Sequence, residues 1–401
     1  MAHFLIIGAG RQGIACGWFL LNRFPEARVA YVDLDRQRLE AARRMGVDAD
    51  RIMTQAHDLD SASTGLESLV EDCDCVVACV PFFHNEDLTR LAIRHRRHFC
   101  DLGGNIATVR RQLALGQAAE AAGVTVVPDC GLAPGAVNVL AEMWRHDWRY
   151  RSVKIFCGGL PQHPRGVLRY QSTFSIHGLL NEYLDDCQVS RGGRVVSIEG
   201  LSEPETVTGL LLPGEFEAFA TSGGASLAPE IYAPAGIDYE YKTLRYPGHR
   251  DVIKAMAEIG LLDIRTVMVR PAATADASRA SPAVPIAPRD LTLSLLEGAL
   301  QSDRRDLVVA CVLVEGVKGS QPVQGRVDWL DYPDARFTAM ERTTGFSAGI
   351  AAAFVAGLLP EQAPPGAFAP FQILPPHRLL EELRRTGTNL QVTSSCTPAA
   401  D

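Results

Sequence analysis

The first apolar segment of the chain runs directly into a glycine-rich turn, and this junction constrains the fold more than any other feature. The segment HFLII is followed by Gly8, Gly10 and Gly13, where a helical pattern begins. A second apolar segment, RVAYVD, ends in Asp33, and an acid about 20 residues beyond a GxGxxG turn is typical of a dinucleotide-binding βαβ unit. The strand, turn, helix and acid together favour a nucleotide site over an ordinary βαβ turn that uses its glycines only for packing.

The positions of this unit have distinct predicted roles. The first glycine permits the tight turn, the second lets the backbone approach a pyrophosphate, and the third lets the helix pack closely on the strand. Free N–H groups at the start of the helix are expected to bind the phosphates. Asp33 is expected to bond the ribose hydroxyls and repel a 2′-phosphate, so NAD is the predicted cofactor, although Arg36 and Arg38 lie close behind. The predicted cofactor-binding residues here are Gly8, Gly10, Arg11, Gln12, Gly13 and Asp33.

Short apolar segments such as CVVACVP and TVVPDCG alternate with helical patterns over the first third of the chain. Buried strands with helices between them predict a doubly wound parallel sheet, so we expect an α/β fold that begins with a Rossmann domain over residues 1–134. Ligands bind outside the carboxyl ends of such strands. Further cofactor contacts are therefore expected from Pro81, Asn85, Gly103 and Gly104.

The pattern changes in the rest of the chain, where apolar segments are more widely spaced and alternate with polar residues. This pattern predicts a mixed sheet, and we expect a substrate and dimerisation domain of α+β type over residues 135–341. Residues 271–288 are rich in proline, alanine and serine and are expected to form a surface loop. Helices within residues 342–387 are expected to return to the Rossmann domain, and residues 388–401 to form a flexible tail.

The composition argues against several classes of protein. A formal net charge of −8 makes broad attraction to nucleic acid or to an anionic membrane unexpected. No segment reaches the roughly 18 to 20 apolar residues that span a bilayer, and the first apolar segment lacks the flanks of a signal peptide, so a cytoplasmic location is expected. The 10 cysteines are scattered without paired CxxC spacing, which indicates reduced core thiols and no metal site.

Several longer segments, taken in order, resemble one enzyme family. They are DLGGN, PDCGLAPG, TFSIHG, TSGGAS, YKTLRYPGH and ERTTGFSAG. They are similar to segments of the saccharopine dehydrogenase-like family and look most like its lysine 6-dehydrogenase branch. The resemblance extends from Phe4 to about Leu383. It implies a Rossmann domain completed by C-terminal helices, an inserted α/β domain and a substrate held in the cleft between them.

The resemblance also implies chemistry at a C–N bond, in which an amine-bearing carbon gives a hydride to a nicotinamide and an imine remains. In the lysine branch the imine is hydrolysed to a semialdehyde that cyclises. The substrate contacts implied position by position are Ser175, Thr221, Ser222, Gly223, Lys242 and Arg245. Arg245 also suits the role by its chemistry, because a guanidinium binds a carboxylate through two parallel hydrogen bonds.

Three positions depart from the pattern of lysine-type members. These members tend to carry acidic groups where this chain has Arg169 and His177, and a histidine is common where this chain has Asn105 after DLGG. Arg169 is therefore a candidate for binding a second substrate carboxylate. The reaction also needs a neutral amine, because a protonated amine has no lone pair to help expel a hydride. The candidates for moving the proton are Asp129, His177, Glu182, Tyr246 and His249, and the sequence leaves the choice among them open.

Three functions follow from these observations. The leading one is an NAD-dependent dehydrogenase that oxidises a small basic amino acid or amine, in its sharpest form L-lysine at the ε amine. The second runs the chemistry in reverse and joins an aldehyde or keto acid to an amine, as in the saccharopine and carboxynorspermidine branches. The third is a non-catalytic NAD-binding regulator. A homo-oligomer, most simply a dimer, is expected because apolar strands of the second domain could extend across a symmetry axis.

Overall fold

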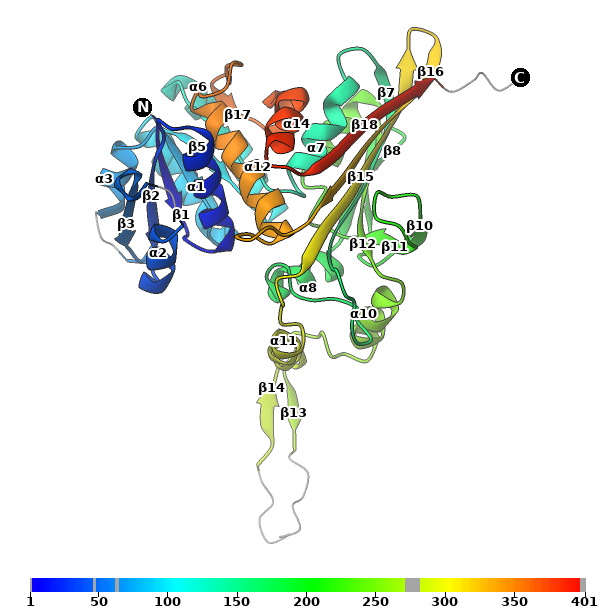
Figure 1. Cartoon of the computed structure of the whole chain (residues 1–401). Helices are drawn as coiled ribbons and strands as arrows, with labels where there is room; N and C mark the ends of the chain where they lie inside the picture. The colour runs from blue at the N-terminus through cyan, green and yellow to red at the C-terminus, as the bar shows by residue number, and fades with distance from the viewer. Residues whose placement is uncertain (1, 46–47, 62–64, 271–281, 397–401) are drawn as a thin grey trace.

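Two large sheets lie side by side in the computed structural model, which describes residues 2–45, 48–61, 65–270 and 282–396 (Figure 1). The first sheet is formed almost entirely by the first third of the chain. The second is formed by the middle and the C-terminal end. This arrangement confirms the predicted α/β class, with a parallel N-terminal sheet followed by a mixed sheet.

The first sheet has seven parallel strands in the order β17-β6-β5-β4-β1-β2-β3. Phe4 and Ile6 of β1 join the core on one face, whereas Leu5 and Ile7 join the core on the other. Alternate side chains of one strand are thus buried on both faces, as expected for a doubly wound sheet. The strands are β1 (His3–Ile7), β2 (Arg28–Asp33), β3 (Ile52–Ala56), β4 (Cys75–Ala78), β5 (His98–Asp101), β6 (Thr125–Val127) and β17 (Gly366–Ala367).

Helices cover both faces of this sheet. One core contains Phe19 of α1 and Phe346 of α12, and the other contains Leu66 of α3 and Leu88 of α4. The helices are α1 (Arg11–Arg23), α2 (Arg36–Arg43), α3 (Gly65–Glu71), α4 (Asn85–Arg94), α5 (Ile106–Leu113), α6 (Gly116–Ala122) and α12 (Ala339–Val355).

Helix α12 connects the second sheet to the first. Its N-terminus is closed by a capping box, in which Thr338 accepts the N–H of Glu341 and the Glu341 carboxylate accepts the N–H of Thr338. Its glycines allow close packing on α1, since a Cβ at Gly345 would lie 2.6 Å from the Cβ of Ala15. The short helices α13 (Pro370–Ile373) and α14 (Pro376–Arg385) pack on α7 (Ala136–Ala141).

The second sheet has nine strands, with a main path in the order β10-β11-β12-β7-β15-β16-β18. Strands β12 and β7 are parallel, and the other neighbours on this path are antiparallel. Two further strands, β8 and β9, extend from β12. The strands are β7 (Arg149–Pro161), β8 (Cys187–Arg191), β9 (Arg194–Ile198), β10 (Glu205–Val207), β11 (Phe216–Ala220), β12 (Asp238–Arg245), β15 (Asp306–Lys318), β16 (Gln321–Asp331) and β18 (Asn389–Cys396).

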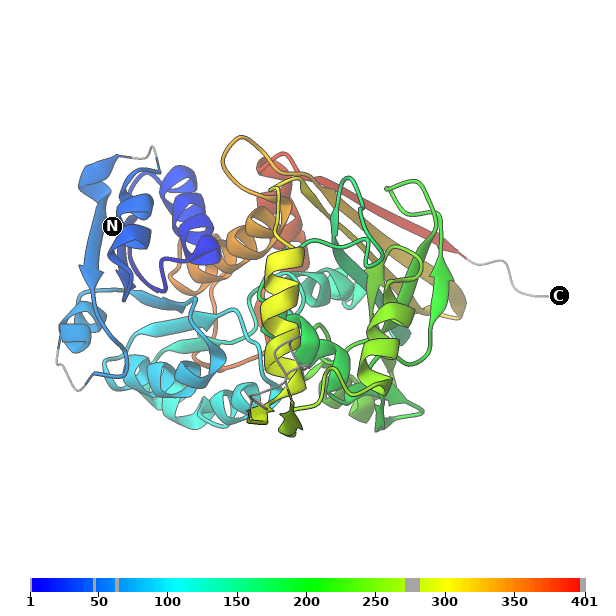
Figure 2. The same ribbon diagram turned by 90° about the horizontal axis from the view of Figure 1, so that it is seen from below.

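The helices of the second domain are α8 (Ile176–Leu184), α9 (Ala228–Tyr232), α10 (His249–Glu258) and α11 (Pro288–Ala299). A separate two-stranded hairpin, β13 (Val267–Val269) with β14 (Val284–Ile286), extends from the molecule beyond α11 (Figure 1). Helix α11 lies below α8, and in the view from below it is in front of the junction of the two domains (Figures 1 and 2). The predicted loop at 271–288 is therefore partly a strand and the start of a helix, and its residues 271–281 lie outside the described residues.

The predicted flexible tail is wrong for most of its length. Strand β18 pairs with β16 in antiparallel register from Leu330 opposite Asn389 to Val323 opposite Cys396. Leu390 is buried there, and the indole of Trp329 donates a hydrogen bond of 2.7 Å to Thr388. The polar composition of the segment favours a tail, but a strand at the edge of a sheet needs only a few apolar contacts in addition to its backbone bonds. Residues 397–401 lie outside the described residues.

Among the residues that the structure describes, no helix has the length and apolar character that crossing a bilayer requires.

Candidate active site

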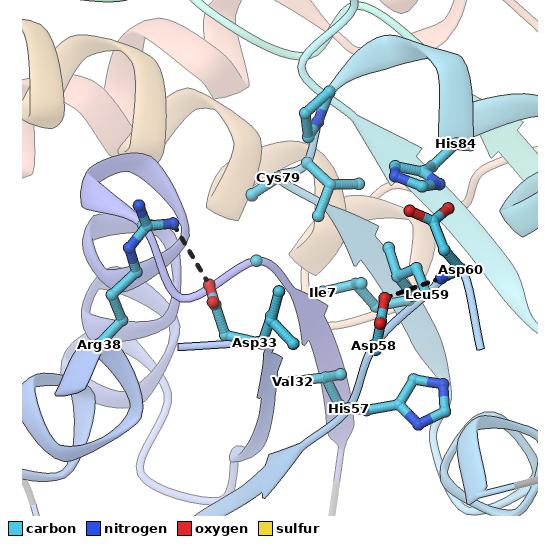
Figure 3. A pocket seen from close by; sticks show the side chains of 15 residues that line it. Ile7, Val32, Asp33, Arg38, His57, Asp58, Leu59, Asp60, Cys79 and His84 are labelled. Carbon is cyan, nitrogen blue, oxygen red and sulfur yellow. Dashed lines mark hydrogen bonds and ion pairs between the residues drawn. The ribbon is translucent and has the colours of Figure 1, made fainter. Parts of the chain in front are cut away.

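A cavity of about 250 Å³ opens at the carboxyl ends of β1, β2 and β4, where the glycine motif lies (Figure 3). We call it the glycine-motif cavity. Gly8 has a φ of +102°, which L side chains rarely adopt, and its N–H donates 2.7 Å to the carbonyl of Val32. A Cβ at Gly10 would meet no atom within 4 Å, so the backbone of this residue borders open space in the cavity.

The cavity suits the phosphates of a dinucleotide. Helix α1 begins at Arg11, directly after Gly10, and the first N–H groups of a helix have no acceptor within it. Together with the positive end of the helix dipole they attract an anion. Gly13 lets α1 approach the turn, because a Cβ there would overlap the carbonyl of Gly8. The turn predicted for Gly8 and the close packing predicted for Gly13 therefore fit the observed geometry, and the approach of Gly10 to a pyrophosphate stays a prediction.

Asp33 lies at the end of β2 and borders the same cavity. Its carboxylate accepts the N–H groups of Ala9 and Asp35, both at 2.8 Å, and Arg38 lies 3.8 Å away from it (Figure 3). Asp58 and Asp60, on the loop after β3, also line the cavity. Three carboxylates and one guanidinium therefore surround the region where a ribose would lie.

The other predicted cofactor contacts differ in their placement. Pro81 lines the glycine-motif cavity. Asn85 does not: it is 1% exposed, and its side-chain oxygen is buried without a hydrogen-bond partner. Gly103 and Gly104 have φ values of +75° and +118° in the turn after β5, and a Cβ at Gly104 would lie 3.4 Å from Phe82. Neither glycine lines this cavity, and their contact with a cofactor stays a prediction.

A second cavity, of about 180 Å³, lies where the two domains meet, and we call it the inter-domain cavity. The Rossmann domain contributes Gln12 from the glycine motif, and α12 contributes Thr344. Its charged residues come from the second domain. It is lined by Gln12, Gly131, Leu132, Ala133, Cys157, Gly158, Gly159, Phe174, Glu182, Tyr241, Thr243, Arg245, Met340 and Thr344.

Glycines on β7 form one wall of this cavity. A Cβ at Gly158 would lie 2.5 Å from the carbonyl oxygen of Leu244, and one at Gly159 would lie 2.5 Å from the methyl carbon of Met340. The GG pair is therefore needed where β7 passes β12 and α12. Gly158 and Gly159 are not among the site residues predicted from the sequence.

Arg245 is 3% exposed and points from the end of β12 into the inter-domain cavity. Its Nε donates 2.8 Å to the hydroxyl of Tyr183, and its Nη1 donates 2.8 Å to the carbonyl of Leu244. The guanidinium carbon lies 4.9 Å from the centre of the Tyr170 ring. Arg245 is the only positively charged residue among the described residues that line the cavity, so it is the group that would bind a carboxylate.

Glu182 lies on α8 at the wall of the same cavity. Burial raises the pKa of its carboxyl to about 7, and the nearby charge of Arg245 opposes this rise. The two side chains are not joined by an ion pair in the described part of the chain, which leaves both able to contact a ligand. A carboxyl group with this pKa can take up and release a proton near neutral pH.

The TSGG segment, residues 221–224, packs against Glu182. Its residues do not line the cavity. The N–H of Ser222 donates 2.9 Å to the backbone carbonyl of Glu182, and a Cβ at Gly223 would lie 2.6 Å from the Glu182 carboxyl carbon. Thr221 bonds to Thr243 at 2.7 Å through their hydroxyls. The predicted substrate contacts at 221–223 are thus one layer removed from the cavity.

Strand alternation separates Lys242 from Arg245. Tyr241, Thr243 and Arg245 face the cavity, so Lys242 faces the opposite side of the sheet. There its ammonium group donates to Glu205 at 2.5 Å and to the carbonyl of Glu203 at 2.9 Å. The prediction that Lys242 contacts substrate is wrong because residues three apart on a strand lie on opposite faces.

Two other predicted residues near β12 and β6 lie outside the cavity. Tyr246 packs on Phe216 and donates 3.0 Å to the carbonyl of Pro161. Asp129 is 4% exposed, and burial together with nearby Asp101 raises the pKa of its carboxyl to about 7. Ser226 of the second domain donates to one carboxyl oxygen of Asp129, and the other is buried without a partner. Asp129 thus ties the two domains together beside the cavity.

Three further predicted residues are exposed. His177 and Ser175 lie at the start of α8, where Ser175 caps the helix and His177 contacts Asn181 at 3.3 Å. Arg169 is exposed in the loop before Tyr170, with a φ of +48°. The structure does not bring any of the three to the inter-domain cavity, because the apolar face of α8 turns Glu182, and not His177, toward it.

The two side chains that follow Gly10 differ in their surroundings. Arg11 donates a hydrogen bond of 2.5 Å to Glu341, and Glu341 also pairs with Arg304 at 3.2 Å. Arg11 therefore links the glycine motif to the start of α12. The side-chain oxygen of Gln12 is buried without a partner at the wall of the inter-domain cavity. Gln12 therefore connects the glycine motif to the inter-domain cavity.

Models of two protein families match the chain. Residues 4–127 match the saccharopine dehydrogenase NADP binding domain, and residues 131–388 match the saccharopine dehydrogenase C-terminal domain. The second match alone covers more than half of the 401 residues.

Curated relatives are similar over part of the chain. It is 24% identical over 233 residues to the NADP(+), L-glutamate-forming saccharopine dehydrogenase of Pyricularia oryzae. The matched region covers 56% of this chain and 51% of that protein. It is 27% identical over 212 residues to the mitochondrial alpha-aminoadipic semialdehyde synthase of Mus musculus. The matched region covers 49% of this chain and 22% of that protein. The chain thus spans about half, or less, of the length of these relatives.

One solved structure has the same fold over almost the full length. An apo saccharopine dehydrogenase (L-Glu forming) from Saccharomyces cerevisiae superimposes with a TM-score of 0.74 at 19% identity, covering 98% of this chain and 100% of that chain. The likeness supports the two-domain α/β architecture described above.

Proposed function

The chain belongs to the saccharopine dehydrogenase family, and from this premise we propose that it is a nicotinamide-dependent dehydrogenase that oxidises the amine-bearing side-chain carbon of a basic amino acid, L-lysine in the first place. The observation that carries the proposal is the pairing of one carboxylate-binding group, Arg245, with one proton acceptor, Glu182, in the inter-domain cavity. An amino acid with a side-chain amine offers a partner for each.

Glu182 is assigned the role of general base. As a carboxylate it takes the proton from the substrate ammonium and leaves the amine neutral. The nitrogen lone pair then forms the C=N bond while the C–H bond of the neighbouring carbon breaks and its electron pair leaves as hydride, which gives a protonated imine. Water hydrolyses the protonated imine to the semialdehyde and ammonium, and Glu182 releases its proton to solvent before the next turnover.

The cofactor site is assigned to the glycine-motif cavity. Bound there, a nicotinamide dinucleotide supplies the hydride acceptor. The N–H groups at the start of α1 would hold its pyrophosphate, and Asp33 would accept hydrogen bonds from its ribose hydroxyls. Gln12 lies at the border of the inter-domain cavity, so this residue would contact the end of the cofactor nearest the substrate.

The charge in the cavity favours a substrate with one carboxylate. Saccharopine carries more than one carboxylate, whereas Arg245 is the only cation among the described cavity residues. Arg169, which the sequence suggested as a second carboxylate-binding group, is exposed and does not line the cavity. We therefore favour lysine oxidation over the saccharopine-type reaction.

The test is reduction of NAD and of NADP, followed by absorbance at mildly alkaline pH with lysine, ornithine, saccharopine, 1,5-diaminopentane and neutral amino acids. Turnover of lysine well above the others supports the proposal. Turnover of saccharopine alone would replace it with the saccharopine-type reaction. Binding of the cofactor without turnover of any amine would favour the non-catalytic regulator.

We predict that NAD is preferred over NADP, and that Asp33→Ser narrows this preference. Loss of the carboxylate removes the ribose contact and frees Arg38, 3.8 Å away, to pair with a 2′-phosphate. We expect KM for NAD to rise about tenfold, as for the loss of a charged hydrogen bond, while KM for NADP falls.

The matched control is Asp48→Ser, which removes an acid of the same domain outside the cavity and keeps a residue able to cap the turn at 49–51. Its ratio of NAD to NADP activity should equal that of the wild type. An unchanged ratio in Asp33→Ser would show that this acid does not contact the ribose.

A further inference from the structure

A chain of buried hydrogen bonds leads from Arg245 to the carbonyl of Leu168, in the loop before α8. The hydroxyl of Tyr183 accepts from Nε of Arg245 at 2.8 Å, and Nε2 of His249 lies 3.0 Å from the same hydroxyl. Nδ1 of His249 lies 2.7 Å from the carbonyl oxygen of Leu168. Arg245, Tyr183 and His249 are each at most 3% exposed, so water does not compete for these bonds.

Each bond in this chain has one allowed direction. The Leu168 carbonyl can only accept, so Nδ1 of His249 must carry a proton. Burial and the charge of Arg245 lower the pKa of His249 to about 3, which keeps the ring neutral and leaves Nε2 without a proton. Nε2 therefore accepts from the Tyr183 hydroxyl, whose oxygen is left to accept from Arg245.

The chain fixes the orientation of the guanidinium. Nε is held by Tyr183 and Nη1 by the Leu244 carbonyl, while the rings of Tyr170 and Tyr183 lie 4.9 and 5.7 Å from the guanidinium carbon. Nη2 has no hydrogen bond to any described residue. The guanidinium is thus held on one side and keeps donors for a ligand in the inter-domain cavity.

We propose that Tyr183 and His249 are positioning residues that hold Arg245 ready to bind the substrate carboxylate. The inference rests on the proposed function for the identity of the ligand. Neither residue touches the cavity, so both act through Arg245. A preorganised guanidinium binds more tightly because less side-chain freedom is lost on binding.

The test is Tyr183→Phe, which keeps the ring and removes the hydroxyl. Since Arg245 holds the carboxylate equally in the ground and transition states, KM for lysine should rise about 10- to 100-fold with kcat within about twofold of the wild type. Affinity for NAD, measured by fluorescence, should not change. The matched control is Tyr239→Phe, a buried tyrosine of β12 that loses only a bond to Asn138.

A second pair of variants separates positioning from packing. His249→Gln keeps an acceptor for Tyr183, and His249→Leu does not, so the glutamine variant should have the lower KM. Equal KM values in Tyr183→Phe and the wild type, or an equal rise in Tyr239→Phe, would overturn the proposal.

The hydrogen-bond chain can also be tested without any substrate. In protein labelled with ¹⁵N-histidine, the resonance absent from His249→Gln should show a neutral ring protonated at Nδ1. A ring protonated at Nε2 would contradict the proposed directions of these hydrogen bonds, whether or not the protein turns over an amine. If a neutral ring protonated at Nδ1 is found and no amine is turned over, the proposed function is wrong but the proposed hydrogen-bond chain from Arg245 to Leu168 is supported.

A different observation concerns the surface. The hairpin β13–β14 is a two-stranded sheet with no further strand among the described residues, and its Val267, Met268 and Val284 are 47%, 64% and 46% exposed. On α11, Leu291 and Leu295 are one turn apart and 48% and 63% exposed. Isolated hairpins are marginally stable in water, and contiguous exposed apolar side chains mark interaction sites.

The charges around these residues are complementary to one another. The hairpin strand β13 is flanked by exposed Arg265, which pairs with Asp263 at 3.7 Å, and by exposed Arg270. Helix α11 carries exposed Asp290 and Glu297. In a two-fold arrangement the same surface meets itself, so the basic hairpin of one copy can meet the acidic helix of the other. We infer that this hairpin–helix surface binds a second copy of the chain.

Sedimentation velocity at micromolar concentration tests this surface. We expect the wild type to be a dimer, and Met268→Asp to weaken dimerisation at least tenfold by burying a charge among apolar side chains. Leu295→Asp on α11 should do the same if the hairpin variant misfolds. The control is Val195→Asp, which changes an exposed valine of β9. A monomeric wild type, or a dimer equally stable in Met268→Asp and Leu295→Asp, would overturn the inference.

Discussion

Replacement of Glu182 by glutamine is expected to lower kcat for lysine by about two to four orders of magnitude, the usual contribution of a general base. Glutamine has nearly the same shape and cannot take the ammonium proton. In the wild type kcat/KM should bend near pH 7, because the pKa of Glu182 is raised to about 7 and only the carboxylate is active. The bend should be absent from the pH profile of Glu182→Gln.

The same substitution should stabilise the protein at alkaline pH. Since the pKa of Glu182 is raised by burial, the folded protein binds this proton more tightly than the unfolded chain does. The carboxyl's contribution to stability is complete below pH 4.5 and is lost as the pH rises through about 7. Above pH 8 we expect Glu182→Gln to unfold with a free energy about 3 kcal/mol higher than the wild type, measured by urea titration.

A matched control is Glu142→Gln. Burial also raises the pKa of Glu142, but this residue bonds to Tyr232 and lies outside the inter-domain cavity. Its kcat should equal that of the wild type. If Glu182→Gln retains more than about a tenth of the wild-type kcat, the proton acceptor is a different group, and Asp129 is the next to test.

The Rossmann domain could be predicted because its signals are local. The turn from Gly8 to Gly13 must carry glycines whatever the rest of the chain does, and Asp33 follows at the end of the next strand. Strand β18 could not be predicted from local signals, because its pairing depends on β16, more than fifty residues earlier in the chain. A polar edge strand and a polar tail have similar sequences.

The substrate region could be predicted only in part. On α8, the sequence offers residues 177 and 182 as proton-transfer candidates, and only Glu182 lines the inter-domain cavity because Leu179, Leu180 and Tyr183 set which side of the helix is buried. On β12 both faces are buried, so the alternation of the strand separates Lys242 from Arg245 without showing which one faces the cavity. That choice depends on where α12 and β7 pack, which is not local.

Replacement of Arg245 by alanine is expected to raise KM for lysine by about 10² to 10⁴-fold, the loss found when one partner of a buried, hydrogen-bonded charge pair is removed. The physical reason is that no other described residue of the cavity carries a positive charge to hold the carboxylate. Affinity for NAD should be unchanged, because Arg245 lies in the second domain and does not line the glycine-motif cavity. Arg245→Lys should fall between the alanine variant and the wild type, since an ammonium keeps the charge but not the two parallel bonds.

The sharpest readout is the discrimination between lysine and 1,5-diaminopentane, which has the same reacting amine and no carboxylate. In the wild type Arg245 should favour lysine strongly, and in Arg245→Ala the two kcat/KM values should approach each other because only the lysine contact is lost. Lys242→Met is the matched control, since it removes a buried cation that faces Glu205 on the other side of β12 and should leave the discrimination intact. If Arg245→Ala still discriminates as the wild type does, Arg245 does not bind the carboxylate. The substrate would then have to lie in the cavity with its carboxylate turned away from β12.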